Sequence, residues 1–325
     1  MTEAEQHAAA IRGGDRRSLA RAITWIESTL PEHQILAQGI LEASVAETGR
    51  AVRVGITGPP GVGKSTFIES FGLHLLSLGH RVAVLAVDPS SPVTGGSILG
   101  DKTRMEQLAQ DERAFIRPSP SGGALGGVAH RTREALLLCE AAGFDVVIVE
   151  TVGIGQSEFA VRSLVDTFLV MLQPGSGDEL QGIKKGVLEL ADALVVNKAD
   201  GEQKAIAERT RGEHQSALSL LRPTSTGWKP RVLSVSSLER VGMPEVWETI
   251  QAHRQALEAS GELEARRRAQ AREWMWRLVD EGLSQAFRAH PAVAEQVSRW
   301  EADVEAQRAT PAAGARALLE AFKAS

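Results

Sequence analysis

Two short polar segments of this 325-residue chain carry the residue types that bind a nucleotide. Residues 58–65 follow the pattern Gly-x-x-x-x-Gly-Lys-Ser, in which glycines let backbone N–H groups converge on phosphate oxygens. We expect Lys64 to reach the β- and γ-phosphates and the Ser65 hydroxyl to bind Mg²⁺. The alternative is a glycine-rich turn that binds nothing. The residues predicted to hold the phosphates are Gly58, Gly61, Val62, Gly63, Lys64, Ser65 and Thr66.

The second segment, residues 197–200 with the sequence Asn-Lys-Ala-Asp, would select the base. The Asp200 carboxylate can accept hydrogen bonds from N1–H and the 2-amino group of guanine, whereas adenine would leave it unpaired. We expect Asn197 to stabilise the loop, Lys198 to lie along the purine face and Ser236 to contact the guanine weakly. A polar turn after a strand is the alternative for this segment alone. Together, the two segments predict a GTPase.

The surrounding elements are those that a phosphate-binding loop requires. Residues 51–57 are apolar and β-branched, which predicts a buried strand, and residues 66–76 have apolar residues at helical spacing. The N-terminus of such a helix adds its positive dipole end to the loop. Residues 192–197 predict a second buried strand that brings Asn197 to its carboxyl end, where ligands bind in parallel sheets.

Three acidic residues are expected on the same side of the sheet. Asp88 and Glu150 each end a predicted strand, and Asp101 lies in a loop rich in Gly, Ser and Pro. Carboxylates there can hold Mg²⁺ directly or through its waters, or orient the attacking water. A helix cap or turn acid is the alternative for each. The catalytic set is predicted to be Lys64, Asp88, Asp101 and Glu150, and the metal set Ser65, Asp88, Asp101 and Glu150.

The segment after Glu150 indicates slow hydrolysis. Gly153 follows three residues later, where its backbone N–H could meet the γ-phosphate. Ile154 takes the place where small GTPases carry a Gln that orients water, and isoleucine cannot do so. Gln156 lies two positions further on, and its reach to the phosphate is open. We therefore expect a slow intrinsic GTPase that is accelerated when a partner orders the loops.

Composition excludes several other classes of protein. The formal charge is −5 without a long basic run, which argues against nucleic acid as a partner. The polar N-terminus and the lack of a long apolar run predict a cytoplasmic protein without a membrane partner. The eight histidines form no metal-ligand pattern. Cys139, the only cysteine, lies in an apolar helical run and is expected to be a buried structural thiol.

The order of elements predicts an α/β fold with a mostly parallel sheet and helices on both faces. We expect an N-terminal helical region over residues 1–50, a P-loop G domain over 51–250 and a C-terminal helical arm over 251–325. The strands are predicted near residues 52–57, 82–87, 144–149, 167–172, 193–196 and 231–235.

Four segments together resemble the MeaB/ArgK-type GTPases, in particular the bacterial MeaB group. These are residues 58–65, 88–92, 95–105 and 150–158, and the resemblance extends over about residues 15–285. It implies a G domain flanked by an N-terminal helical region and a C-terminal dimerisation arm, and it places Asp88, Asp101 and Glu150 near Mg²⁺ and the γ-phosphate. It also implies a chaperone of adenosylcobalamin-dependent methylmalonyl-CoA mutase that uses GTP to gate cofactor loading and protects the mutase from inactivation.

The resemblance further suggests a switch that couples the mutase to GTP hydrolysis. This is the loop at residues 173–185, where Asp178, Gln181 and Lys184 could reach the partner or the nucleotide. A solvated loop is the alternative. Two other functions stay open, a P-loop kinase of small molecules of the transport-kinase type and a metal-delivery GTPase. No acceptor pocket is evident for the first, and Cys139 alone cannot supply metal ligands for the second.

Trp274 and Trp276 bear on the oligomeric state. They lie two residues apart on a predicted helix and therefore point to nearly opposite sides. One can enter the core of the chain itself, and the other needs a cover. A homodimer would supply that cover. A C-terminal segment that folds back over the exposed tryptophan is the alternative.

Overall fold

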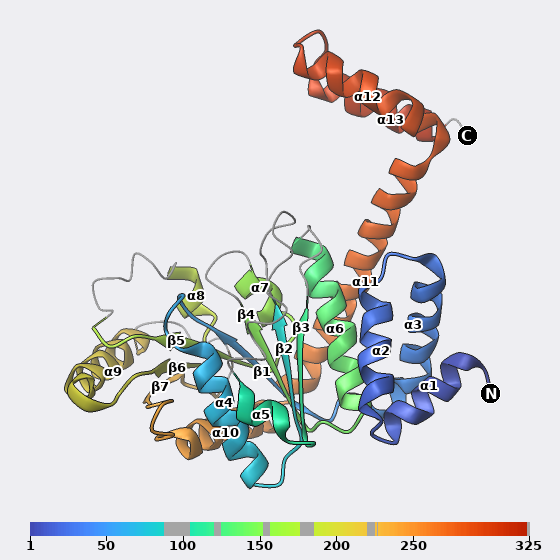
Figure 1. The fold of residues 1–325 in the computed structure, drawn as a ribbon. Coiled ribbons are helices and arrows are strands. Elements are labelled where there is room, and N and C mark those ends of the chain that lie inside the picture. Colours follow the sequence, from blue (N-terminus) through green and yellow to red (C-terminus); the bar gives the residue numbers. More distant parts are fainter. Residues whose placement is uncertain are drawn as a thin grey trace. The chain divides into compact units, whose positions relative to one another are not determined.

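The computed structural model describes residues 1–87, 105–119, 125–151, 157–175, 185–219, 225 and 227–323. Their contacts divide the chain into two compact units, residues 1–264 and 265–325. The first unit holds the sheet and most of the helices, and the second holds most of α11 with α12 and α13 (Figure 1). No helix among these residues is both long and apolar enough to cross a membrane.

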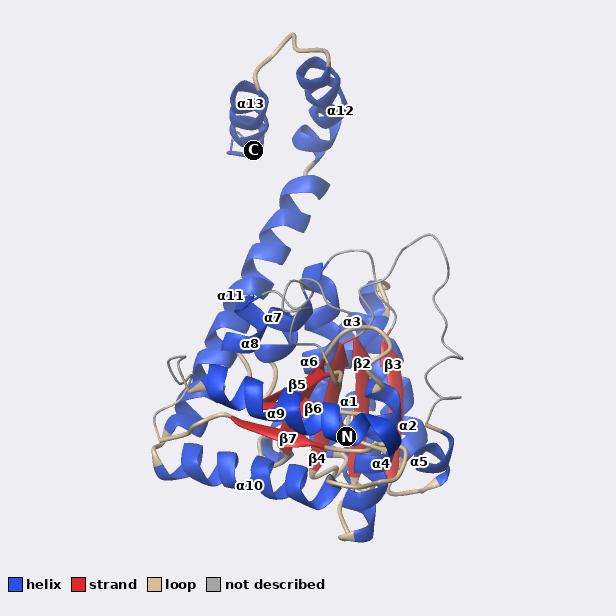
Figure 2. Ribbon diagram, turned by 90° about the vertical axis from the view of Figure 1, so that its left-hand side faces the viewer, coloured by secondary structure: helices blue, strands red, loops and turns tan. Residues whose placement is uncertain are grey.

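A seven-stranded sheet forms the centre of the first unit (Figure 2). The order is β3-β2-β4-β1-β5-β6-β7, and every pair of neighbours is parallel. The α/β class with a parallel sheet is therefore confirmed. The strands are β1 Val52–Thr57, β2 Val82–Val87, β3 Ala114–Ser119, β4 Val146–Thr151, β5 Thr167–Leu172, β6 Ala193–Val196 and β7 Arg231–Ser234.

Helices cover both faces of the sheet, as parallel strands require. Alternate residues of most strands enter two separate clusters of buried side chains, one on each face, whereas β1 contributes to one cluster only. The first cluster includes residues of three helices, which are α4 Lys64–Ser77, α5 Glu106–Gln110 and α10 Met243–Ala259. The second cluster, on the other face, includes residues of α6 Leu125–Ala141, α7 Ser157–Arg162, α8 Lys185–Glu189 and α9 Lys204–Leu218. Cys139 is buried in the second cluster as expected, and burial raises the pKa of its thiol.

The N-terminal helices belong to the same compact unit as the sheet. They are α1 Glu3–Arg12, α2 Arg16–Glu27 and α3 Pro31–Ser44, followed by the 3₁₀ turn η1 Val45–Glu47. Ile11, Leu19 and Ile23 are fully buried in the cluster that also holds residues of α6. Arg117 of β3 forms an ion pair with Glu27 of α2, which joins this helix to the edge of the sheet.

β3 was not among the predicted strands. Its sequence contains Pro118, which argues against a central strand because proline has no N–H for the ladder. The structure resolves the conflict, since β3 is an edge strand and Pro118 pairs in register with Ala86 of β2. β4 also begins and ends two residues later than predicted, so Glu150 lies within the strand and Thr151 ends it.

The opposite edge of the sheet is covered by a side chain of α9. The Gln215 amide receives a hydrogen bond from the Val232 N–H at 3.0 Å and donates one to the Pro230 carbonyl at 3.4 Å. The side chain thus makes the contacts that a further strand would make with β7. Such covering is a common protection against pairing with another chain.

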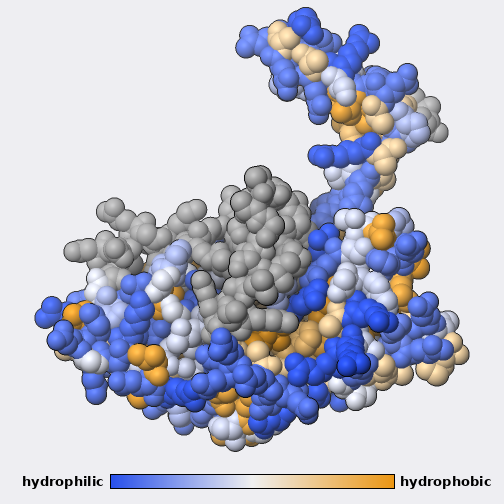
Figure 3. All heavy atoms as spheres, in the orientation of Figure 1, coloured by the Kyte–Doolittle hydropathy of each residue, from blue (hydrophilic) through white to orange (hydrophobic). Residues whose placement is uncertain are grey.

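The second unit is helical. α11 runs over Glu262–Ala289, and α12 Pro291–Glu305 packs against α13 Pro311–Lys323. The Phe287 and Phe322 rings lie 5.4 Å apart, and the buried Gly314 lies beside Trp300. The hydropathy surface in Figure 3 shows both hydrophilic and hydrophobic residues on these helices. Large exposed apolar side chains of α11 are Met275, Trp276, Leu278, Val279 and Leu283.

A buried ion pair fixes β1 to α6. Arg53 Nε and Nη2 donate to the two Glu140 carboxylate oxygens at 2.7 and 2.9 Å, and the Gly49 N–H donates to Oε2 at 2.6 Å. The Arg53 and Glu140 side chains are 6% and 1% exposed. Removing one partner of such a pair leaves a buried charge without compensation.

We therefore predict that Glu140→Ala lowers the free energy of unfolding by about 3–5 kcal/mol. Urea unfolding of the purified chain measures this. The matched control is Arg211→Ala, which removes an exposed pair with Glu208 and should cost no more than about 1 kcal/mol. Equal losses in the two variants would contradict the role given to the buried pair.

Candidate nucleotide site

The phosphate-binding loop connects β1 to α4, as predicted. Thr57 ends the strand, and Gly63, with φ +94°, is the cap residue before Lys64 begins the helix. Val62 is fully buried, Ser65 is half-buried in the first turn and Thr66 is exposed. The N-terminus of α4 therefore lies directly behind the loop, where its dipole favours an anion.

Two glycines of the loop have no space for a side chain. A Cβ at Gly58 would lie 2.8 Å from the Met171 carbonyl oxygen of β5. A Cβ at Gly63 would lie 2.7 Å from Nδ2 of Asn197, and its positive φ disfavours any other residue as well. The loop is therefore packed tightly against the ends of β5 and β6.

Asn197 joins three loops through one amide group. Its Nδ2 donates to the Val62 carbonyl at 2.9 Å, while its Oδ1 accepts from the Ser237 N–H at 3.1 Å and the Ser237 hydroxyl at 2.6 Å. The side chain is 2% exposed, so these bonds are shielded from water. The expectation that Asn197 stabilises its loop agrees with this geometry. The neighbouring Lys198 also contacts the phosphate loop, because its Nζ donates to the Gly61 carbonyl at 2.7 Å.

The residues predicted to read the base form a second small network. Asp200 accepts a hydrogen bond at 2.5 Å from the hydroxyl of Ser236, which follows β7. Ser236 also accepts from the Glu239 N–H at 3.1 Å and forms a bridge with Val241. Asp200 is half-buried. Ser236 thus orients the carboxylate that was predicted to read guanine. The weak contact between Ser236 and the base itself stays a prediction.

Lys64 is held inside the loop. Its Nζ donates to the carbonyls of Gly58 at 2.8 Å and Pro59 at 3.3 Å. The residue is 9% exposed. Burial lowers the pKa of its ammonium, and the charge of Glu150 acts in the opposite direction. Phosphate oxygens would replace the two carbonyl partners and supply full negative charge.

Hydroxyl and carboxylate groups at the ends of β1 and β4 face the same loop. Glu150 is 3% exposed and interacts with the charge of Lys64. Next to it, the Thr151 hydroxyl donates to the Thr57 hydroxyl at 2.7 Å between buried side chains. This pair was not predicted, although Thr57 directly precedes Gly58 and Thr151 directly follows Glu150 in the sequence.

The structure brings together only part of the predicted site. The P-loop residues, Glu150, Asn197, Lys198, Asp200 and Ser236 lie at one edge of the sheet. Ser237, which holds Asn197, was missed; its signal was a second Ser after the strand that ends at Ser234. The predicted residues outside the described part of the chain are Asp88, Asp101, Gly153, Ile154, Gln156, Asp178, Gln181 and Lys184.

The donors that are present fit Mg²⁺. Ser65 lies in the first turn of α4 and Glu150 is the last residue but one of β4, and their hydroxyl and carboxylate groups are the hard oxygen ligands that this ion prefers. Glu150 is buried beside the phosphate loop, where its charge interacts with that of Lys64. Within the described residues, no group of three or more His, Cys, Asp or Glu is placed to hold a metal. A bound ion would therefore rely on phosphate and water oxygens for further ligands.

This arrangement defines a P-loop nucleotide-binding protein. The chain belongs to the family described as methylmalonyl-CoA mutase-associated GTPase MeaB, whose sequence model matches residues 19–292. Guanine-nucleotide binding and GTP hydrolysis are thereby assigned at the level of the family.

Individual relatives match over most of their length. A protein of Caulobacter vibrioides named as a putative GTPase is 57% identical over 95% of this chain and 94% of its own. The GTPase ArgK of Escherichia coli is 53% identical over 83% and 82%. The mouse mitochondrial homolog of methylmalonic aciduria type A is 48% identical over 95% and 77%. A crystal structure described as an LAO/AO transport system kinase superposes with a TM-score of 0.77 at 40% identity, over 99% of both chains.

Gly63→Ala should reduce the affinity for nucleotide. The new methyl group would displace Asn197 from Val62 and break buried hydrogen bonds, each worth about 1 kcal/mol, so we expect a loss of at least about tenfold. Titration with a fluorescent GDP analogue measures this.

Gly79→Ala provides the matched control. Gly79 has nearly the same φ, +90°, but nothing lies within 4 Å of its added Cβ. Both variants carry a backbone strain of about 1–2 kcal/mol, whereas only the first disturbs Asn197. An equal loss of affinity in both would refute the packing argument.

Proposed function

We propose that this protein is a GTP-dependent chaperone of an adenosylcobalamin-dependent methylmalonyl-CoA mutase. The observation that carries the nucleotide part is the pair of networks that tie Asn197 to the phosphate loop and Asp200 to Ser236. The mutase part rests on the family, which is described as associated with that enzyme. In this role, GTP gates the loading of the cofactor and protects the mutase from inactivation.

The residues of the chain act mainly by binding and positioning. Backbone N–H groups of the loop and the N-terminus of α4 receive the phosphates, and Lys64 exchanges its carbonyl partners for phosphate oxygens. Asp200, held by Ser236, accepts from the guanine edge. A bound Mg²⁺ would neutralise developing phosphate charge, with Ser65 and Glu150 as ligands directly or through water. Asp88 and Asp101 are proposed for the same task.

We further propose that hydrolysis by the isolated protein is slow and that the partner accelerates it. Ile154 has no group that can orient water at the position where small GTPases carry Gln. A second copy of the chain is proposed as a partner through α11, where Trp276 is 58% exposed beside other apolar side chains. A cytoplasmic location, without nucleic-acid or membrane partners, also belongs to this proposal.

The first test measures hydrolysis of GTP, with ATP as the control nucleotide, in the absence and presence of methylmalonyl-CoA mutase. We expect turnover of GTP alone at roughly 10⁻⁴ to 10⁻² s⁻¹, as in GTPases without a stimulating partner, and a clear rise with the mutase. A rate of GTP hydrolysis that is the same with and without the mutase would contradict the chaperone role but not the GTPase activity. Equal use of ATP would overturn the role of Asp200.

The loop at residues 173–185 is proposed as the switch that senses the mutase, through Asp178, Gln181 and Lys184. Lys184→Ala should then lower the mutase-stimulated rate more than the basal rate. Lys204→Ala, an exposed lysine at the start of α9, is the control and should change neither rate. An equal loss of basal and stimulated activity in Lys184→Ala would rule out the switch.

One observation favours a second candidate, a small-molecule kinase. The solved structure at 40% identity carries the name of a transport system kinase. A kinase would transfer the γ-phosphate to an acceptor, so an assay with labelled GTP distinguishes the two functions. Release of the label only as inorganic phosphate supports the GTPase.

A further inference from the structure

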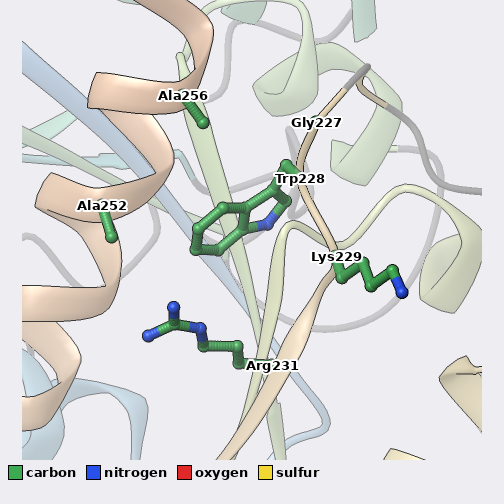
Figure 4. A pocket seen from close by; sticks show the side chains of 6 residues that line it. All are labelled: Gly227, Trp228, Lys229, Arg231, Ala252 and Ala256. Carbon is green, nitrogen blue, oxygen red and sulfur yellow. The ribbon is translucent and has the colours of Figure 1, made fainter.

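A pocket lies at the amino end of β7, whereas the nucleotide loops follow the carboxyl ends of the strands. It occupies about 520 Å³ and is open to solvent. Such a volume is within the usual range for ligand pockets. Trp228 and Arg231 precede and begin β7, whereas the nucleotide loops follow the other ends of β6 and β7. The lining residues are Gly227, Trp228, Lys229, Arg231, Ala252 and Ala256 (Figure 4).

The aromatic wall of this pocket is fixed in place. The Trp228 indole N–H donates to the Asp192 carbonyl at 2.8 Å, directly before β6. Its ring lies 5.0 Å from the ring of His253, which is fully buried in α10. The indole is 5% exposed, so it cannot turn without breaking buried contacts. The pocket therefore has a preorganised surface.

Arg231 is held on this surface with its hydrogen-bond donors available. Its guanidinium carbon lies 5.2 Å from the centre of the Trp228 ring, a cation–π contact that orients the planar group. Figure 4 shows the guanidinium lying on the side of the ring that faces α10. Among the described residues, no carboxylate forms an ion pair with Arg231 or with Lys229. A stacked guanidinium in this state is suited to bidentate binding of an oxyanion.

The local sequence also lacks negative charge. From His214 to Leu238 the chain contains no Asp or Glu, although these residues number 41 of 325 overall. The same segment contains Lys229 and Arg231, which both line the pocket. The positive charge of the pocket is therefore not neutralised by its own segment.

The rest of the lining distinguishes a carboxylate from a phosphate. Ala252 and Ala256 lie one turn apart in the second half of α10, and their methyl groups form an apolar wall. The C-terminal end of a helix carries partial negative charge, which disfavours two negative charges on one group, as in a phosphate dianion. Among the described residues that line the pocket, none belongs to a helix N-terminus that would favour a phosphate group.

We propose that this pocket binds a carboxylate with apolar carbon atoms next to it, through Arg231 and Lys229. Arg231 donates to the carboxylate while Trp228, Ala252 and Ala256 contact the adjoining carbons. A Glu side chain in a peptide segment and a free dicarboxylic acid both have this chemistry. The pocket is separate from the nucleotide site, and the proposal does not depend on the proposed function.

NMR of the full chain bound to GDP tests this through the indole N–H signal of Trp228, assigned with Trp228→Phe. The probes are the peptide acetyl-Ala-Glu-Ala-amide, glutarate and inorganic phosphate. We expect a saturable shift with a carboxylate probe, and a loss of affinity of roughly tenfold or more in Arg231→Gln, from losing a charge-assisted hydrogen bond. Tighter binding of the peptide indicates a protein segment as the ligand, and tighter binding of glutarate indicates a free acid.

Arg209→Gln is the matched control, because Arg209 is an exposed arginine of α9 outside the pocket and the charge change is the same. Its affinity should equal that of the unchanged chain. Arg231→Lys keeps the charge but loses the planar guanidinium group. This variant should bind the carboxylate probe more weakly than the unchanged chain and more tightly than Arg231→Gln. The proposal fails if neither carboxylate shifts the signal, if Arg231→Gln binds as before, if both Gln variants lose affinity equally, or if phosphate binds more tightly than both carboxylates.

Discussion

The nucleotide site depends on one buried amide group. Asn197 bonds Val62 of the phosphate loop with its nitrogen and Ser237 of the loop after β7 with its oxygen. These partners are 135 and 40 residues away along the chain, so the amide group joins segments that are distant in sequence. The geometry of the phosphate loop and of the base-reading loop is therefore set jointly. A change that moves either loop must also change the hydrogen bonds of the other.

The carboxyl ends and the amino ends of the strands carry different kinds of polar group. At the carboxyl ends of the strands, small polar side chains and loop carbonyls bond to one another in and beside the phosphate loop. Nearer the amino ends, buried charges bond across elements, as Arg53 does with Glu140 and Arg162 with Asp192. Parallel sheets commonly bind ligands at the carboxyl ends of their strands. The ion pairs near the amino ends fix the helices to the strands and thereby support the site.

Sequence patterns were sufficient for the parts whose chemistry is local. The glycines, Lys64 and Asp200 lie within short motifs, and their surrounding strands and helix have clear periodicity. β3 could not be recognised because Pro118 is acceptable only at an edge, and strand order is a property of the whole sheet. Ser237 and the Trp228 pocket were missed for a related reason. Their roles arise from contacts between residues distant in sequence, namely with Asn197 and with Asp192 and α10.

Both outer strands of the sheet are poor templates for another strand. Pro118 interrupts the donors of β3, and Gln215 occupies the donor of Val232 and the acceptor of Pro230 at β7. Extension of the sheet by a foreign polypeptide is thus obstructed at each margin. Helices and side chains are then the surfaces left for recognition of other proteins. A main-chain ladder would adhere to almost any extended sequence, and its absence favours selective and reversible association.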